Sequence, residues 1–350
     1  MSEPNVERGP TIVDVARLAN VSVSTVSRVV RKHSDVKGET RERVHAAIET
    51  LGYQPSPIAR ALVSGRTRLI ALLVSDIANP FYPQLARSVE QEAKRMDYTV
   101  VICNTGDRPA ETRRYLERLL QQGLDGVVHA SVSGDENVLY ELLPDRRRLV
   151  FTNRPPRGRE ASYVVSDNAG GAEALTRHLL SRGHRRVGFI AGPSFATNAV
   201  ARVQGFRRVM AEAGETDPLV AEGDFSAIHG ATTALLWRQS ADPPSALIAV
   251  NDSVALGALE ALTDRGLSVP EDVALAGFDG TRLAASPLVD LTTVDQRIDR
   301  MGRRAVRVLL RQLSRRTGGP TRETLPTQLL VRGSTEVRSI GGVRRGSPVR

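Results

Sequence analysis

The stretch Thr11-Ile-Val-Asp-Val-Ala-Arg-Leu-Ala-Asn-Val-Ser-Val-Ser-Thr-Val-Ser-Arg-Val-Val30 has apolar residues at helical spacing on both sides of a short polar break. The break covers residues 20–22. The apolar positions are Ile12, Val15, Ala16 and Ala19 before the break, and Val26, Val29 and Val30 after it. This pattern predicts two short amphipathic helices joined by a tight turn.

Two helices this short need a third to complete a core. Residues 40–51 supply it, and Gly52 is a natural stop. The apolar face of this third helix is Val44, Ala47, Ile48 and Leu51. Thr11 and Asp14 have the spacing of a capping box at the first helix, and Ser22 is positioned to cap the second.

The second helix has the features of a DNA-reading helix. In a helix-turn-helix, the first turns of the second helix face base edges, while hydroxyls and helix N-termini hold phosphates. Arg28 fits the paired acceptors of guanine. The candidate DNA-contacting residues are Thr11, Ser22, Val23, Ser24, Thr25, Ser27 and Arg28. On these residues alone, a generic three-helix cluster with a solvated arginine stays an open alternative.

The residues that follow, 51–65, predict a linker that contains a short helix. Ser56 is a cap and Pro57 suits the first helical position. A helix over 57–63 would be marginal alone, and we expect it to fold against DNA and a partner chain.

From residue 69 onward, short apolar runs alternate with helix-length amphipathic stretches. The runs are 69–74, 98–103, 126–128, 148–152, 187–191, 247–250 and 273–276. This is the pattern of an α/β fold with parallel sheets. The rhythm is interrupted near 163–167 and again near 291–294.

These residues carry a resemblance to the lactose repressor (LacI/GalR) family of bacterial transcription regulators. The matching stretches include TIVDVARLANVSVSTVSRVV, TRERVHAAIETLGYQPSPIARALVSGRT, NPFYPQLARSVEQEA, AVNDSVALGALEAL and VALAGFDGT, in family order from about Thr11 to Thr335. The resemblance implies a three-helix head, a hinge and a two-lobed body like that of periplasmic binding proteins. The expected division is a head over 11–54, a hinge over 55–66, lobe 1 over about 67–163 and 296–322, and lobe 2 over about 164–295 and 323–337. Residues 1–10 and the basic tail 338–350 are expected to be disordered.

Several polar or turn residues lie just after the ends of predicted strands, where open parallel sheets bind ligands. Ser75, the 79–82 turn, Asn153, the pair Asn251–Asp252 and Asp279 all do so. The resemblance implies that Arg202, expected at a helix start, binds the effector together with Asn251 and Asp279, while Phe225 stacks on it. The candidate effector residues are Ser75, Phe81, Asn153, Arg202, Phe225, Asn251 and Asp279.

A carboxylate, amides, a guanidinium and an aromatic face suit the hydroxyls and apolar side of a sugar. The alternatives are that Asp252 caps a helix, that Asn153 only ends a strand, and that Ser75 satisfies loop backbone.

The resemblance further implies a homodimer on a palindromic operator, with Leu62 wedged into the central base step and Ala59 beside it. The effector would shift the paired hinges and so alter DNA affinity. No leucine heptad follows Val331, so a dimer is favoured over a tetramer.

The chain departs from the family pattern at four places. Arg31 stands where asparagine is usual, Lys37-Gly38 where a serine or aspartate cap is usual, and Ser56 where a hinge asparagine is common. Arg154-Pro155-Pro156-Arg157 could reach into the cleft, which keeps an acidic or phosphorylated effector open.

Composition narrows the class of protein. The net charge of +9 over 350 residues suits a polyanionic partner, and the excess is almost all arginine, with lysine at Lys32, Lys37 and Lys94. The single cysteine, Cys103, excludes an internal disulfide and is expected to be a buried strand residue. No apolar run approaches a membrane span and the N-terminus has no apolar signal core, so we expect the cytoplasm, with the nucleoid.

Enzyme classes find little support in the sequence. No Gly-x-Gly-x-x-Gly follows a strand, and no phosphate loop is present. The six histidines lack metal-ligand spacing and carboxylate pairing; His129, at a strand end, is expected to be a hydrogen-bonded wall residue. We therefore expect no catalytic residues, no metal and no cofactor.

Overall fold

The computed structural model describes residues 10–30, 35–53, 66–131, 134, 136–157, 161–314 and 318–336. The chain divides into two compact units, a head within Met1–Thr67 and a body, Arg68–Arg350. The predicted hinge helix over 57–63 and, apart from Pro10, the two termini expected to be disordered lie outside the described residues.

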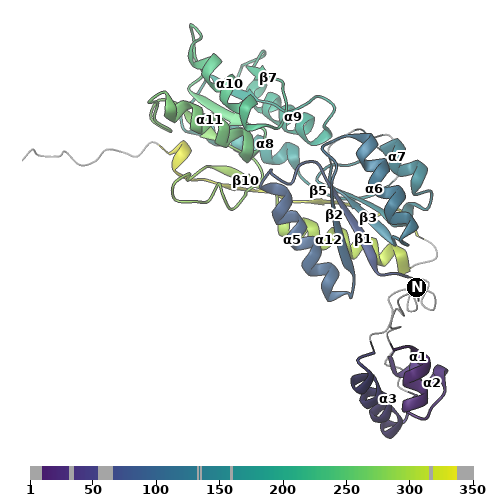
Figure 1. The fold of residues 1–350 in the computed structure, drawn as a ribbon. Coiled ribbons are helices and arrows are strands. Elements are labelled where there is room, and N and C mark those ends of the chain that lie inside the picture. Colours follow the sequence, from purple (N-terminus) through teal and green to yellow (C-terminus); the bar gives the residue numbers. More distant parts are fainter. Residues whose placement is uncertain are drawn as a thin grey trace, which may run out of the picture. The chain divides into compact units, whose positions relative to one another are not determined.

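The described residues of the head form the helices α1 (Ile12–Leu18), α2 (Val23–Val30) and α3 (Gly38–Leu51), seen in purple in Figure 1. Thr11 and Asp14 form the predicted capping box, and the Ser22 Oγ accepts a hydrogen bond from the Thr25 N–H at 3.1 Å. The predicted apolar faces meet in one core around Val15, Val26 and Val44. The helix-turn-helix head predicted from the sequence is confirmed.

The third helix begins two residues earlier than predicted. Gly38 is its first residue, and Lys37 is an N-cap without a side-chain hydrogen bond. Gly52 ends the helix in the left-handed region at φ +61°, where a side chain would add strain.

Lobe 1 of the body is built on a six-stranded, wholly parallel sheet in the order β11-β5-β4-β3-β1-β2. Its strands are β1 (Leu69–Val74), β2 (Thr99–Asn104), β3 (Gly126–His129), β4 (Leu149–Thr152), β5 (Ser162–Ser166) and β11 (Arg322–Leu325). The helices of lobe 1 are α5 (Phe81–Arg95), α6 (Pro109–Gln121), α7 (Glu136–Leu142), the short η1 (Arg146–Arg148) and α12 (Ile298–Ser314). Strand β1 shows why both faces are covered: Ile70 and Leu72 pack with α5 and α12, whereas Ala71 and Leu73 pack with α6 and α7.

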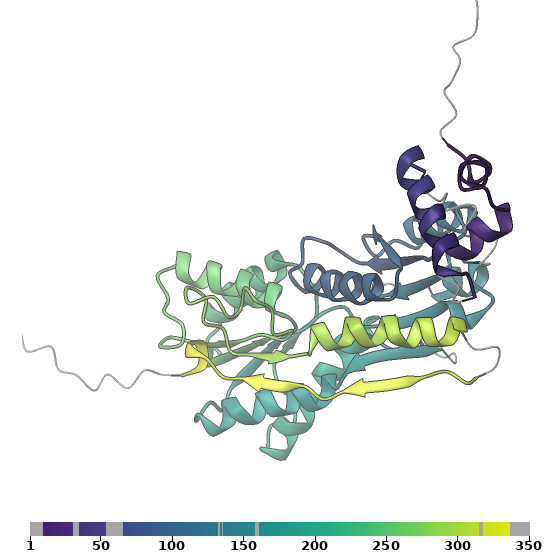
Figure 2. The same cartoon turned by 90° about the horizontal axis from the view of Figure 1, so that it is seen from below.

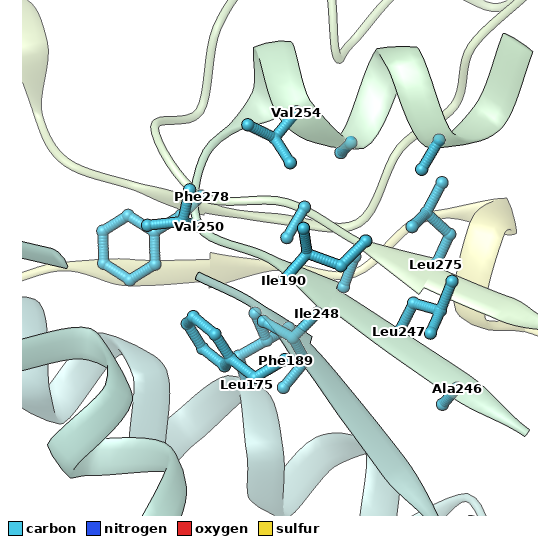
Figure 3. Packing of buried hydrophobic residues seen from close by; sticks show 14 of the residues in the cluster. Leu175, Phe189, Ile190, Ala246, Leu247, Ile248, Val250, Val254, Leu275 and Phe278 are labelled. Carbon is cyan, nitrogen blue, oxygen red and sulfur yellow. The ribbon is translucent and has the colours of Figure 1, made fainter. Parts of the chain in front are cut away.

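Lobe 2 is built on a four-stranded parallel sheet in the order β7-β6-β8-β9. Its elements are β6 (Val187–Ile190), β7 (Val220–Ala221), β8 (Ala246–Ala249), β9 (Ala274–Ala276), α8 (Asn168–Ser181), α9 (Thr197–Glu212), α10 (Ala227–Arg238) and α11 (Asp252–Asp264). Figure 3 shows the core on both faces of this sheet, with Phe189 near Leu175 on one side and Ile190 toward Val254 of α11 on the other. Gly257 lets α11 approach α10 closely, because a Cβ there would meet the Ala227 carbonyl.

The chain passes between the lobes three times. It crosses after β5, along β10 (Thr293–Asp295), and along β12 (Gln328–Leu330), which pairs antiparallel with β10 before the short η2 (Gly333–Thr335). Figure 2 shows the last stretch, in yellow, running the length of the body. The expected lobe boundaries need correction here. Strand β11 pairs in register with residues 163–166 of β5, so it belongs to lobe 1, and the final crossing comes after Leu325.

Candidate functional site

A cavity of about 690 Å³ lies between the two lobes, at the carboxyl ends of their strands. All seven candidate effector residues lie on its walls: Ser75, Phe81, Asn153, Arg202, Phe225, Asn251 and Asp279. The rule that open parallel sheets bind ligands beyond the carboxyl ends of their strands, here called the strand-end rule, therefore located the cavity from the sequence.

The wall from lobe 1 is a network of hydroxyls around Asp107. The Ser75 and Ser131 hydroxyls donate to Asp107 Oδ1 at 2.6 and 2.7 Å, and the Tyr82 hydroxyl donates to the Ser75 Oγ at 2.9 Å. The Ser75 hydroxyl therefore bonds the side chains of Asp107 and Tyr82 on this wall. Burial, and then the charge of Asp107, raise the pKa of Tyr82, so this phenol stays a hydrogen-bond donor.

Asn153 joins the two walls. It follows β4 with a φ of +70°, and its Oδ1 accepts a hydrogen bond from Asn198 Nδ2 of α9 at 3.2 Å. Beside it, the Thr197 hydroxyl donates to the Pro155 carbonyl at 3.3 Å. Asn153 therefore both ends its strand and lies on the cavity wall, and its contact with an effector stays a prediction.

Arg202 is a fully buried cation, only 2% exposed. It lies in the second turn of α9 rather than at the helix start, which corrects the sequence expectation. Its Nε donates to Asn168 Oδ1 at 2.8 Å and its Nη1 to the Val250 carbonyl at 2.6 Å, and the guanidinium lies over the Phe278 ring. Burial lowers the pKa of Arg202 to about 10, so it stays charged at neutral pH.

Asp279 is the carboxylate opposite this cation. Its Oδ1 lies 3.6 Å from Arg202 Nη1 and accepts a hydrogen bond from Gln296 Nε2 at 2.5 Å. Burial raises the pKa of Asp279 to about 8 against the opposing effect of Arg202. Burial therefore favours the neutral form of this carboxyl group, whereas a hydrogen bond donated by a ligand hydroxyl would favour the ionised form.

One alternative, that Asp252 caps α11, is wrong. The cap is Asn251, whose Oδ1 accepts from the Val254 N–H at 2.8 Å. Asp252 instead accepts from the N–H and hydroxyl of Thr281, both at 2.8 Å, and from the Thr293 hydroxyl at 2.5 Å. Burial raises the pKa of Asp252 to about 6.

Both carboxylates are tied to the same interlobe crossing. Thr293 is the first residue of β10, and Gln296 directly follows that strand. The carbonyl of Gln296 also accepts a hydrogen bond from the Ser166 hydroxyl at 2.8 Å, at the end of β5. A change at the lobe 2 wall is therefore one hydrogen bond away from the segments that connect the lobes.

The arginine-rich stretch after Asn153 does not supply charge to the cavity. Arg154 is 1% exposed and pairs inside lobe 1 with Glu136 Oε1 at 2.5 Å. Arg157 donates to the carbonyls of Ser194 and Phe195 in lobe 2. Among the described residues on the cavity walls, Arg202 is the sole cation, whereas the acids are Asp76, Asp107, Asp224 and Asp279.

His129 and Cys103 lie in the core of lobe 1. The His129 ring packs against Phe151 with centroids 5.2 Å apart and is not on the cavity wall, so the expectation of a wall residue is wrong. Burial raises the pKa of the Cys103 thiol to about 11, as suits an unreactive strand residue. Within the described parts of the chain, no cluster of acidic, histidine or cysteine side chains could hold a metal.

Most of the predicted DNA-contacting residues of the head lie on α2 or at its N-terminal end, from Ser22 at the start to Arg28 in the last turn, whereas Thr11 caps α1. Ser22, Val23, Ser24 and Arg28 are exposed, and Thr25 and Ser27 are half-buried. The Ser22 hydroxyl is bonded to those of Ser24 and Thr25 at 2.7 and 2.8 Å, and Arg28 lies 3.6 Å from Asp35. The remaining calls on this surface, Ala59, Leu62, Arg31 and Ser56, lie outside the described residues.

Comparisons with known proteins match both units. Residues 11–56 match the model of bacterial regulatory proteins of the lacI family, and residues 176–335 match that of the periplasmic binding protein-like domain. The ribose operon repressor of Halalkalibacterium halodurans is 38% identical, over 93% of this chain and 97% of that protein. The chain belongs to the LacI family.

Other members of the LacI family align over almost the whole length. The transcriptional regulator DegA of Bacillus subtilis is 36% identical over 93% of this chain and 98% of its own. A solved CelR–cellobiose complex has 34% identity, 93% and 99% coverage and a TM-score of 0.70. The lac repressor dimer bound to operator has 27% identity, 94% and 100% coverage and a TM-score of 0.82. This LacI-family chain is accordingly a DNA-binding transcriptional regulator.

Sequence reasoning missed several cavity residues in this family member. Asp107 follows β2 and a two-residue turn, so the strand-end rule could have found it. Asn198 lies one helical turn before Arg202 on α9, so helical spacing could have found it. No sequence signal pointed to Phe195 and Ile228, two exposed apolar residues on the cavity wall.

Proposed function

We propose that this protein represses transcription by binding a palindromic operator as a homodimer, and that a sugar or sugar derivative in the interlobe cavity controls its DNA affinity. The observation that carries the proposal is the lobe 2 wall. There the buried side chains of Arg202 and Asp279 line a ligand-sized cavity. Asp279 also accepts a hydrogen bond from Gln296, which follows β10 in the segment that passes between the lobes.

The cavity chemistry supports a polyhydroxylated ligand. Ligand hydroxyls can donate to Asp107 and Asp279, accept from Arg202 and exchange both kinds of bond with Asn251 and Asn153. The excess of acidic groups over the single cation disfavours a phosphorylated or acidic ligand. Among the relatives, the ribose operon repressor and the CelR–cellobiose complex carry sugar names, which fits the same class.

The head supports DNA reading by α2. Its exposed first turns present hydroxyls and the N-terminal end of the helix, which together hold phosphates, and Arg28 is placed one turn further for base contact. Two such heads on a twofold dimer match a palindromic site. In this proposal Ala59 and Leu62 belong to hinges that enter the minor groove.

In this proposal, the segments that connect the two lobes transmit the effect of the ligand to DNA binding. A ligand that binds Asp279 and Arg202 alters the hydrogen bonds that Asp279 and Asp252 share with Gln296 and Thr293. Those residues connect the lobes, so ligand binding favours one lobe arrangement over another. Because a ligand acts only through its different affinity for two states, operator and effector binding must be linked.

The proposal assigns no catalytic role to the cavity and places the protein with the nucleoid. The relatives found by comparison are named as transcriptional regulators. The part of the chain that the structure describes has no helix with the length and apolar character that a membrane crossing requires.

The test is sequence-specific DNA binding that a sugar changes. Genomic fragments captured by the purified chain are sequenced, and the recurring site is measured by fluorescence anisotropy at fixed salt with a sugar panel. We expect a palindromic site whose affinity changes at least 5-fold with one sugar, and half-site inversion should abolish binding. Equal affinity for captured and scrambled DNA contradicts the proposal.

A further inference from the structure

We infer that the effector has at least two sugar rings, and that the second ring lies on an apolar platform formed by Phe195 and Ile228 of lobe 2. This inference rests on the proposed function of the cavity. It goes beyond that function because it names the size of the ligand and the residues that set specificity.

The cavity wall has side chains of opposite character. Its floor is polar and closed: Arg202, Asp279, Asn251 and Asn153 are each less than 5% exposed. On lobe 2 its wall also carries two open apolar side chains: Phe195 is 47% exposed and Ile228 is 77% exposed. Phe225 is half-buried, so its exposure lies between that of the floor residues and that of Phe195. Its ring lies so close to Gly192 that a Cβ at that position would clash with it.

The floor offers the groups that one sugar ring uses. A cation, a carboxylate and two amides can satisfy the hydroxyls around a single ring, and Phe225 offers a face for its apolar side. The side chains of Phe195 and Ile228 have no hydrogen-bonding groups. They suit a second ring that presents a C–H face to the platform and its hydroxyls to solvent.

The loop that carries Phe195 is fixed from three directions. Arg157 of lobe 1 donates to the carbonyls of Ser194 and Phe195, and the Ser194 N–H donates to Glu222 Oε1 at 2.9 Å. The Ala196 N–H closes the turn on the Pro193 carbonyl at 3.0 Å. An exposed phenylalanine on so constrained a backbone is a preformed surface, so little conformational entropy opposes ligand binding.

The volume of the cavity agrees with two rings. A single pyranose fills on the order of 200 Å³, on a scale of about 30 Å³ for one water molecule. The cavity measures about 690 Å³, near the middle of the range for ligand sites, so two rings of this size fit in it. One ring on the floor would leave the platform uncovered.

The experiment is isothermal titration calorimetry on the full chain with cellobiose, maltose, trehalose and lactose, each compared with glucose, galactose and ribose. We expect one disaccharide to bind at least 10-fold more tightly than its component monosaccharide. Phe195→Ala should reduce disaccharide affinity about 5- to 10-fold, the scale of one lost aromatic contact, and leave monosaccharide affinity within 2-fold.

Two further variants separate the platform from general damage. Ile228→Ala should weaken disaccharide binding about 2- to 4-fold. Leu236→Ala, on the same helix α10 and 65% exposed but outside the cavity, should change nothing. Arg157→Ala should weaken the disaccharide selectively, because Arg157 positions the loop without lying on the cavity wall.

The outcomes distinguish this inference from the proposed function. Monosaccharide and disaccharide binding of equal strength, or an equal loss of both in Phe195→Ala, overturns the two-ring inference and leaves sugar control standing. Selective binding of 4-nitrophenyl glucoside with no disaccharide preference also overturns it, in favour of an apolar substituent. Failure of every sugar to bind contradicts the proposed function and this inference together.

Discussion

The two walls of the cavity are built differently, although both come from the ends of parallel strands. On the lobe 1 wall, Ser75, Tyr82 and Asp107 bond one another and Ser131 of the same lobe. On the lobe 2 wall, the buried guanidinium of Arg202 faces the buried carboxyl group of Asp279, and Asp279 accepts a hydrogen bond from Gln296 in the segment that passes between the lobes. The difference suggests separate roles for the two walls. The lobe 1 wall offers groups that bind a ligand, whereas the lobe 2 wall both offers such groups and contacts a segment that connects the lobes.

Asp279→Ala should have the largest effect. It removes a ligand acceptor and leaves Gln296 Nε2 and the buried Arg202 without this partner, so effector affinity should fall at least 100-fold. Operator affinity without effector should stay within 3-fold, as measured by anisotropy. Asp264→Ala, on the exposed end of α11, is the matched control. A variant that keeps its effector response removes Asp279 from the account.

Asp107→Asn should have a smaller effect, on binding alone. The amide oxygen still accepts from Ser75 and Ser131, but the hydrogen bonds lose their charge, so effector affinity should fall about 10-fold. At saturating effector, the change in operator affinity should equal that of the wild type. If the saturated response is lost instead, the lobe 1 wall also carries the signal and the contrast between the walls is wrong.

Thr293→Val tests the link from lobe 2 to the crossing. The change removes the hydroxyl that donates to Asp252 Oδ1 at 2.5 Å, and it should lower the free energy of unfolding by about 1–3 kcal/mol. Effector affinity should change less than 3-fold, while the effect of saturating effector on operator affinity shrinks. Thr293→Ser keeps the hydroxyl and should behave as wild type. An unchanged response in the valine variant would exclude this route.

The pH dependence of stability tests the buried carboxyl group of Asp279 without any ligand. Burial raises the pKa of Asp279 to about 8, well above its ordinary value of 3.8, so the folded chain keeps a proton that the unfolded chain releases. The free energy of unfolding should therefore fall as pH rises from about 5 to 8. Asp279→Asn should flatten that slope in urea titrations followed by circular dichroism. Identical slopes in the two proteins would mean that Asp279 is ionised throughout.

The sequence predicted the parts of the fold in which local pattern and burial agree. The apolar faces of α1–α3 and strands such as β1 and β8 are short runs of buried residues, so periodicity found them. Strand β11 has the sequence Arg-Glu-Thr-Leu, and β7 has only two residues. Both lie at the edges of their sheets, where most of their side chains are not fully buried, so they carry no apolar run. Such strands are specified by pairing partners distant in sequence, which a local pattern does not contain.

The candidate site divides in the same way. Residues at strand ends, such as Asn153 and Asp279, were predictable because topology gathers strand ends at one edge. The role of Asp252 was not, because its partners Thr281 and Thr293 come from other segments. Arg154 shows the converse: a charge next to the site in sequence points into lobe 1, toward Glu136.

The most direct test of the central claim is reciprocal linkage, measured on the wild-type chain with its captured operator and its tightest-binding sugar. Operator affinity is measured by anisotropy with and without saturating sugar, and sugar affinity by calorimetry with and without saturating operator, at one salt concentration. The account predicts that the two ratios are equal and at least 5-fold. A sugar that binds the cavity tightly while both ratios equal one would contradict it.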